Sequence, residues 1–349
     1  MFKEIDINLK QKPSSYYQRE IRKKLPKEIF KNNPQRLLWL FFHLLLIILW
    51  SSIIIYTQNI LIRLLCSILI GNSLGTLGFL GHEILHGTVI RGKKAMLFWG
   101  GVCMLHWGLP PQVWIAWHNK QHHHHTNKWF DDPDCFGPVG MYKKSRWVQF
   151  MEKLTPGSGT KRSYGFLFYW FSLHTVYNIM KNPKAFKLEK NRKYGLMYFI
   201  GVFIVWLCIS SLLTNQGWIF LLLIPLTISN FVMMSYVATN HFISPSTDNV
   251  VDPLINTLTV RSNKFVEKMH LQNNFHIEHH LFPDINPSQA EKIRNVLKER
   301  WPERYQEMQH MEALRLVYKT PRFYSKYTEL ENPRTGKKSE TLLSHYLDI

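Results

Sequence analysis

Hydrophobic residues are gathered in this chain into long unbroken runs, separated by stretches rich in lysine and arginine. Four runs are close to the length of about 20 residues that an α-helix needs to cross the hydrocarbon core of a bilayer. Three residues separate the first run from the second, and three separate the third from the fourth. The pattern therefore predicts an all-α integral membrane protein with two tight helical hairpins, whose four transmembrane helices span residues 37–56, 60–80, 194–214 and 218–238.

Charged residues predict the orientation of these helices. Residues 1–36 carry ten Lys/Arg and four Asp/Glu, whereas neither hairpin turn carries a charged residue. Because cytoplasmic segments hold the excess of positive charge, both termini and the segment between the hairpins are predicted to be cytoplasmic. In a bacterium, this topology predicts a multi-pass protein of the cell inner membrane. Arg63, near the outer end of the second helix, is expected to extend its head group to the interface.

Two further hydrophobic runs, residues 95–110 and 164–180, are shorter and more polar. If either run crossed the membrane alone, the later histidine clusters of the chain would lie on the opposite side from the first, and one metal site could not be assembled from them. Both runs are therefore predicted to be interfacial or re-entrant helices.

The chain after residue 282 has the composition of a cytosolic segment. Asn286-Pro287-Ser288 is typical of a helix start and precedes a predicted helix at residues 290–301. Residues 332–345 are expected to be flexible. The predicted organisation is a basic cytosolic segment (1–36), a membrane domain that includes a cytosolic helical cap (37–301), and a cytosolic C-terminal helix with a flexible tail (302–349).

The whole chain has 43 Lys/Arg against 24 Asp/Glu, a formal net charge of +19. Nucleic-acid binding is not expected, because the basic residues form neither a recognition helix nor an aromatic-rich RNA-binding motif. The charge instead suits contact with anionic membrane lipids and with an acidic partner. The four cysteines form no CxxC pair and support neither a disulfide framework nor a zinc knuckle. No cleavable signal peptide is expected at the polar N-terminus.

Three short windows hold most of the seventeen histidines and lie at the cytoplasmic ends of predicted helices. They contain His82 and His86 in residues 81–87, His118 and His122–His125 in residues 117–127, and His276, His279 and His280 in residues 272–283. Histidines outside these windows are interpreted as structural, for example His43, His106 and His174.

The spacing within each window suits metal binding. Residues four apart on a helix lie one above the other, so His82 and His86 can bind one ion together. By the same spacing, His118 and His122 share a stripe with His123 beside them, and the third window presents three imidazoles on one side of a helix. Neutral imidazole is a good ligand for iron, copper, nickel and zinc. Eight such groups exceed what one tetrahedral or octahedral ion uses, so the sequence predicts two metal ions.

One motif favours a different chemistry. The sequence His82-Glu83-x-x-His86 matches the HExxH pattern of zinc proteases, in which Glu83 would be the general base. A zinc site of that kind needs only one more ligand and leaves the other two windows unexplained. A membrane zinc protease therefore stays a distant alternative.

The three windows resemble the histidine boxes of the membrane fatty acid desaturase family. Box one (HxxxH) is His82 and His86, box two (HxxxHH) is His118, His122 and His123, and box three (HxxHH) is His276, His279 and His280. Their order and their placement around two hairpins also match, over about residues 37–300. Box two leaves a choice between His122/His123 and the following pair of histidines, and the Thr126-Asn127 that comes next favours the earlier pair.

The resemblance implies two iron ions (Fe2+/Fe3+) and a further ligand, His241, at the end of the fourth helix. It implies a fatty acid (acyl-lipid or acyl-CoA) desaturase that uses dioxygen and two electrons from a separate donor such as a ferredoxin. The acyl-chain lipid substrate would occupy an apolar tunnel among the helices, with Trp107, Trp114 and Trp117 at its mouth. Related hydroxylases and ketolases carry similar boxes and form the alternative.

The metal ligands are expected to need hydrogen-bond acceptors that orient their rings. No protein nucleophile is expected, so the catalytic residues are the ligands themselves. The candidate orienting residues lie within or near the boxes and are Glu83, Asp132, Asp134, Asn240, Gln272, Asn273 and Glu278.

Overall fold

The computed structural model describes residues 11–181, 189–247 and 250–342 of the chain. Four of its helical segments are long and apolar enough to cross a membrane, at Pro34–Tyr56, Ile60–Leu85, Lys193–Leu213 and Trp218–His241. They correspond to α2 (Leu38–Tyr56), α3 (Ile60–Leu85), α10 (Glu189–Leu213), and the π-helical η8 (Trp218–Leu223) that continues into α11 (Ile224–His241). The prediction of a mostly helical protein with four candidate membrane spans is thus confirmed.

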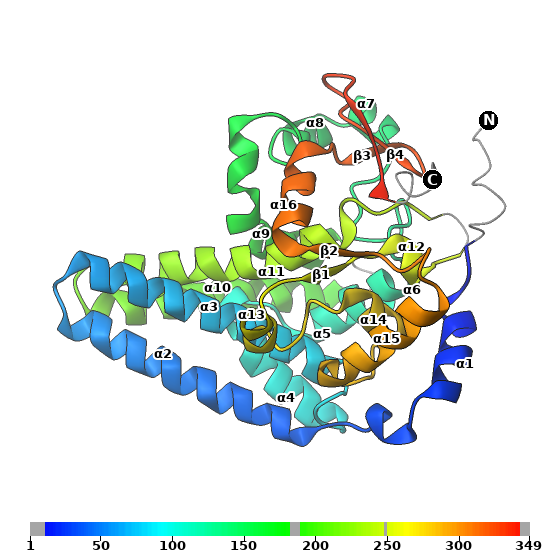
Figure 1. Cartoon of the computed structure of the whole chain (residues 1–349). Coiled ribbons are helices and arrows are strands. Elements are labelled where there is room, and N and C mark those ends of the chain that lie inside the picture. Colours follow the sequence, from blue (N-terminus) through cyan, green and yellow to red (C-terminus); the bar gives the residue numbers. More distant parts are fainter. Residues whose placement is uncertain (1–10, 182–188, 248–249, 343–349) are drawn as a thin grey trace.

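The two hairpin turns lie at the same end of the helices (Figure 1). In the first turn, the Asn59 side chain caps α3 by accepting hydrogen bonds from the backbone N–H groups of Leu61 and Ile62. In the second turn, a Cβ atom on Gly217 would lie 1.7 Å from the carbonyl oxygen of Ser210. Only glycine permits so close an approach, which explains its position at this turn.

Arg63 lies one turn into α3, and its head group reaches the second hairpin turn. Its Nη2 donates a 2.6 Å hydrogen bond to the carbonyl oxygen of Asn215, and its guanidinium lies 4.3 Å from the Phe220 ring centroid. The side chain is buried because both partners come from the second hairpin.

Two of the four long helices form the centre of the bundle, and two lie outside it. About half of the most apolar window is buried in α3 (56%) and α11 (50%), against 17% in α2 and 6% in α10. The outer pair therefore presents most of its apolar side chains to the surroundings, as lipid-facing helices do.

The two shorter hydrophobic runs are helical. The first forms α4 (Lys93–Met104) and the 3-10 turn η4 (Leu105–Trp107), and the second forms η6 (Lys161–Phe168) and α9 (Trp170–Lys181). Both α4 and α9 have 12 residues, or about 18 Å at 1.5 Å per residue. That length is less than the hydrocarbon core of about 30 Å, in line with helices that do not span.

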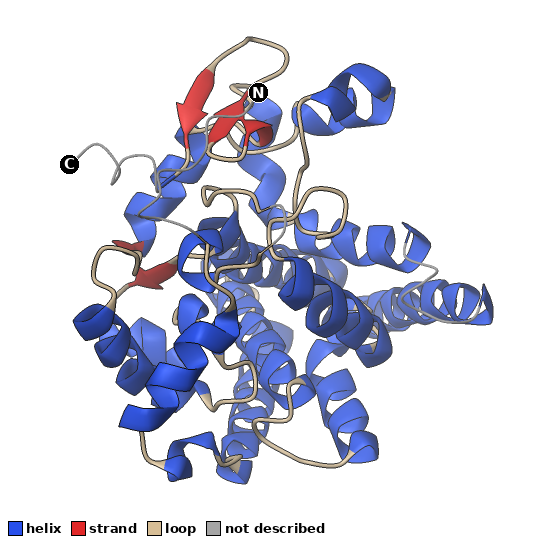
Figure 2. Cartoon of the chain, turned by 90° about the vertical axis from the view of Figure 1, so that its right-hand side faces the viewer, coloured by secondary structure: helices blue, strands red, loops and turns tan. Residues whose placement is uncertain are grey.

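The remaining helices lie toward the other end of the bundle, away from the hairpin turns (Figure 1), and Figure 2 shows the molecule with this end facing the viewer. They are α1 (Ser14–Lys24), η2 (Lys27–Phe30), η3 (Pro34–Leu37), α5 (Pro111–Trp114), η5 (Ile115–His122), α6 (His123–His125), α7 (Gly140–Lys144), α8 (Arg146–Glu152), α12 (Pro253–Asn256), α13 (Lys264–Met269), α14 (His276–Leu281), η9 (Pro287–Gln289), α15 (Ala290–Arg300) and α16 (His310–Lys319). The predicted helix start is present, because the Asn286 side chain accepts a hydrogen bond from the backbone N–H of Ser288.

The described residues also include five short strands, which corrects the all-α prediction. β1 (Thr259–Arg261) pairs in parallel with β2 (Glu307–Gln309), while β3 (Phe323–Lys326), β4 (Glu329–Glu331) and β5 (Lys338–Glu340) form an antiparallel sheet. The predicted flexible tail differs as well, since residues 332–342 include β5 and the buried Leu342. Strands this short are too brief for a period-two pattern to show in the sequence. The rest of the predicted tail, 343–345, lies outside the described residues.

Candidate metal centre

Box two lies on an unusual helix. η5 (Ile115–His122) is a π-helix, and its pattern closes with a hydrogen bond from the backbone N–H of His123 to the carbonyl of His118. In a π-helix, bonded residues are five apart instead of four. The side chains of His118 and His123 therefore lie together, with their Nε2 atoms 3.2 Å apart. The rings of His118 and His122 stack with centroids 5.1 Å apart, as predicted for one stripe. The π turn nevertheless gathers the ligand atom of His122 with a second group of histidines.

The first group of histidines contains five residues from all three boxes. They are His82, His86, His118, His123 and His279, whose ligand atoms all lie within 4.8 Å of one another. Four of the Nε2 atoms form a closed ring in the order 82, 118, 123 and 279, with neighbouring atoms 3.0–3.2 Å apart. The Nε2 atom of His86 is also buried and has no hydrogen-bond partner among the described residues.

The second group contains four buried histidines, namely His122, His241, His276 and His280. Nε2 of His276 lies 2.6 Å from that of His241 and 3.1 Å from that of His280. All nine histidines predicted as ligands therefore fall into two groups of five and four. The two groups adjoin each other, because the rings of His123 and His280 are 4.4 Å apart.

These nitrogen atoms are spaced as ligands of metal ions are. A square with edges of 3.0–3.2 Å has its centre about 2.2 Å from each corner, close to a metal–imidazole bond, which is about 2.0–2.1 Å for zinc. A neutral imidazole has one N–H, so hydrogen bonding among the rings alone does not account for so many converging nitrogens. The residues present therefore fit two metal ions.

The protonation states of the rings also suit metal binding. Burial, followed by the neighbouring imidazoles, lowers the pKa values of His118, His123 and His279 well below their usual range. The same two causes lower the pKa values of His276 and His280. These rings are thus neutral near pH 7, and neutral imidazole is the form that binds metals.

The exposure of the four consecutive histidines indicates which pair belongs to box two. His124 is exposed and His125 is only half-buried, whereas His122 is buried within the second group. The earlier pair, His122 and His123, is the one that the structure places among the other box histidines.

Two carboxylates orient His122. Its Nδ1 atom lies 3.0 Å from Asp132 Oδ1 and 3.3 Å from Asp134 Oδ2. Although burial opposes it, these carboxylates raise the pKa of His122 to about 9. Asp132 is itself fixed by the backbone N–H of Asn127, at 2.7 Å. The Nε2 atom of His122 is therefore left to face the other three histidines of its group.

We expect Asp132→Asn to weaken metal retention by about 10- to 100-fold, the usual effect of removing a carboxylate that orients a ligand. The change keeps the side-chain shape but removes the charge that holds His122. The measurement is metal content after graded exposure to a chelator. Asp131→Asn is the matched control, because Asp131 is exposed and pairs with Lys128. Equal retention in both variants would exclude an orienting role for Asp132.

Glu83 is not placed as predicted. Both of its carboxylate oxygens accept 2.5 Å hydrogen bonds from the guanidinium of Arg36, which is buried. Arg36 also donates to the carbonyl of Leu271 at 3.0 Å and to Oε1 of Gln272 at 3.4 Å. Glu83 thus joins box one to the turn before box three, and this pairing also argues against its use as a protease base.

That turn has an uncommon backbone. Leu271 and Gln272 have φ values of 56° and 59°, in the left-handed region that non-glycine residues rarely adopt. The contacts with Arg36 hold both residues there. Since His276 follows four residues after Gln272, Arg36 helps to fix where box three begins.

The other predicted orienting residues have separate surroundings. Asn240 is buried beside His241 and lines a small cavity with His82 and His118, and its amide has no hydrogen-bond partner among the described residues. Asn273 lines the same cavity. Glu278 accepts hydrogen bonds from Tyr305 and Thr259, at 2.6 and 2.7 Å, and burial raises its pKa to about 7. Glu278 therefore connects box three to β1 and to the chain after α15.

Sequence reasoning did not identify three residues near the histidines. Arg36 has been described above, the Thr126 hydroxyl lies 3.3 Å from His280 Nδ1, and the His174 ring lies 3.5 Å from Asp134 Oδ1. His174 was interpreted as structural because it stands alone in the sequence. Only the packing of α9 against the metal centre brings it to Asp134.

Helices able to span a membrane, together with a buried histidine cluster able to hold metal, define a candidate membrane metalloprotein. The family model for fatty acid desaturases matches residues 58–312, which is most of the chain and contains the eight box histidines and His241. The chain therefore belongs to the fatty acid desaturase family. The comparison with curated proteins gave no match.

Proposed function

We propose that this protein is a desaturase that inserts a double bond into the acyl chain of a lipid or acyl-CoA. The reaction would use dioxygen, two external electrons and two iron ions. The observation that carries the proposal is the convergence of nine histidines into two adjoining groups of metal-ligand spacing, in a chain of this family. Five histidines would hold one iron and four would hold the other.

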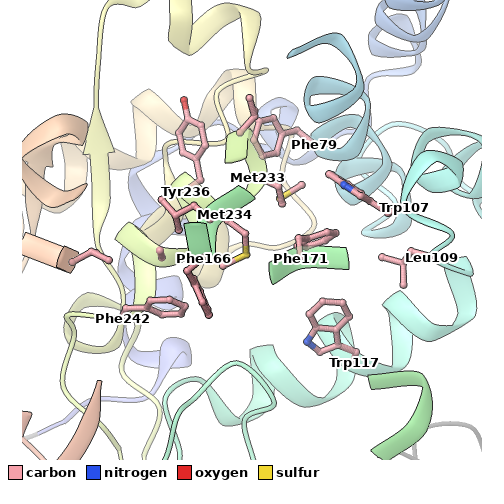
Figure 3. Packing of buried hydrophobic residues seen from close by; sticks show 14 of the residues in the cluster. Phe79, Trp107, Leu109, Trp117, Phe166, Phe171, Met233, Met234, Tyr236 and Phe242 are labelled. Atoms are coloured by element: carbon pink, nitrogen blue, oxygen red, sulfur yellow. The ribbon is translucent and has the colours of Figure 1, made fainter. Parts of the chain in front are cut away.

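When bound, the iron pair would supply the oxidising chemistry, and the protein would position the chain. An unactivated methylene offers no polar group to bind, so its placement depends on the shape of the surrounding apolar surface. A cavity of about 40 Å³ beside the histidines is lined by Phe79, Trp114, Trp117 and Phe171. These side chains are buried and belong to an aromatic-rich core (Figure 3). They present an apolar surface next to the ligands.

We also propose that the histidine end of the bundle and both termini face the cytoplasm, on the strength of the Lys/Arg excess there. The electron donor would be a separate acidic protein such as a ferredoxin. His86, His123 and His279 are only half-buried, and Lys120 in η5, three residues before His123, is exposed. A donor that approached this face would meet positive charge close to the first histidine group.

Lipid analysis tests this function directly. We expect expression in a host of defined lipids to yield fatty acids that have lost two hydrogens, as measured by mass spectrometry. A double variant, His279→Ala with His280→Ala, is the inactive control because it removes one ligand from each group. A gain of one oxygen would instead indicate a hydroxylase or ketolase of the same family. A single zinc in the purified protein, with unchanged lipids, would indicate the protease alternative.

A further inference from the structure

A large apolar cleft lies in the membrane part of the bundle. It has a volume of about 700 Å³, and α2, α3, α4 and α10 provide most of its walls. Its lining is largely aliphatic, including Leu74, Leu77, Val205 and Ile209. Three residues, Val102, Leu105 and Tyr198, also line a groove of about 980 Å³ that continues between α4 and α10. An acyl chain has the chemistry that fits such a surface.

The cavity beside the histidines is much smaller. At about 40 Å³, it has room for a few water molecules, each of which needs about 10–15 Å³. It does not hold the length of an acyl chain. A chain whose methylenes reach the histidines must therefore extend into a neighbouring space, and the cleft of about 700 Å³ is large enough.

The Trp107 indole contacts one residue from the lining of each space. On one side, its ring is 4.1 Å from that of His106, which lines the cleft. On the other side, it is 4.3 Å from the ring of Phe171, which lines the histidine cavity. Figure 3 shows Phe171 between Trp107 and Trp117. Trp107 is fully buried, so its indole fills the wall between the cleft and the cavity.

The position of this indole depends on Gly78 of α3. A Cβ atom at residue 78 would lie 2.2 Å from Cη2 of Trp107, so any other residue would displace the ring. The indole N–H has no hydrogen-bond partner among the described residues, although buried tryptophans usually find one. Movement of the ring therefore breaks no hydrogen bond, and only packing holds it in the wall.

We infer that Trp107 is a specificity-determining residue, which sets how far an acyl chain passes from the histidine cavity into the membrane cleft. Its size determines which methylenes stand beside the metal ligands. This inference rests on the proposed function, since it assigns a substrate position within the same reaction.

The first test is a size series in the full-length protein: Trp107→Phe, Trp107→Leu and Trp107→Ala. Mass spectrometry of the lipids measures the double-bond position and the lengths of the chains that react. We expect the ratio of products at neighbouring positions or lengths to change by about tenfold or more, because one methylene in an apolar pocket changes discrimination by about 10- to 200-fold. The change should increase as the side chain becomes smaller. Trp39→Leu is the control, since Trp39 lies on α2 and lines neither space.

The second test measures binding without turnover. Palmitic acid with a diazirine at its methyl end is photolysed with the purified wild-type protein, and the labelled peptides are identified. We expect label on the cleft residues of α3 and α10. Unchanged product ratios across all three Trp107 variants, with only a lower rate, would overturn the inference, as would label confined to other surfaces. Cleft labelling in a protein that forms no double bonds would contradict the proposed function while supporting the cleft as a chain-binding site.

Discussion

Alanine in place of His276 should lower activity by more than about 100-fold, beyond the usual cost of losing a residue that only orients a ligand. His276 belongs to the group of four, which has no spare ligand, so the purified variant should also lose one iron per chain. His86→Ala removes one of five ligands from the other group and should retain more metal than His276→Ala. Iron content, measured by elemental analysis beside the lipid product, distinguishes these cases.

His124→Ala is the matched control for both variants. His124 stands in the same histidine run but is exposed, so its loss should leave iron content and lipid products unchanged. If His124→Ala removed as much iron as His276→Ala, the assignment of box two to His122 and His123 would be wrong.

Arg36→Met should destabilise the folded protein by about 3–5 kcal/mol, because it leaves the buried Glu83 carboxylate without its partner. Arg36 and Glu83 are 7% and 3% exposed as side chains, so water does not replace the lost contact. The free energy of unfolding, measured by chemical denaturation in detergent, reports this change. The double variant Arg36→Met with Glu83→Leu should recover much of the loss, because no buried charge then remains unpaired.

An exposed ion pair provides the comparison. Arg19 is 71% exposed and lies 3.7 Å from Glu20, and exposed pairs contribute about 0–1 kcal/mol. Arg19→Met should therefore alter stability little. A similar loss in Arg19→Met and Arg36→Met would show that the Arg36 pair has no special role.

The membrane part of the fold was predictable because each long helix is encoded in one continuous stretch of sequence. The prediction for the third helix, residues 194–214, differs by one residue at each end from the span Lys193–Leu213. The second helix continues to Leu85, beyond its predicted end at residue 80, because its last turn is buried by protein and needs no long apolar run. Five strands of three or four residues were not predictable, since their pairing depends on distant partners.

The histidines that come together were predictable, eight from their spacing and His241 from the family resemblance, but their distribution between two groups was not. His118 and His123 share a group because η5 is a π-helix, and no residue in that segment distinguishes a π turn from an α turn. Glu83 was assigned to the histidines because it stands between two of them in the chain. Its actual partner, Arg36, is 47 residues away in the sequence, and such pairings follow only from tertiary packing.

The loose packing of α10 has a consequence for how such a protein would be regulated. Only 6% of its most apolar window is buried by protein, so α10 would meet lipid tails along much of its length, and it forms one wall of the cleft. Double bonds in the lipid chains make a bilayer more fluid and thinner, and both changes affect a helix that is surrounded by lipid. The unsaturated lipid formed by the proposed reaction would thus change the bilayer around α10 and, through this helix, the enzyme itself. Such feedback requires no dedicated effector site.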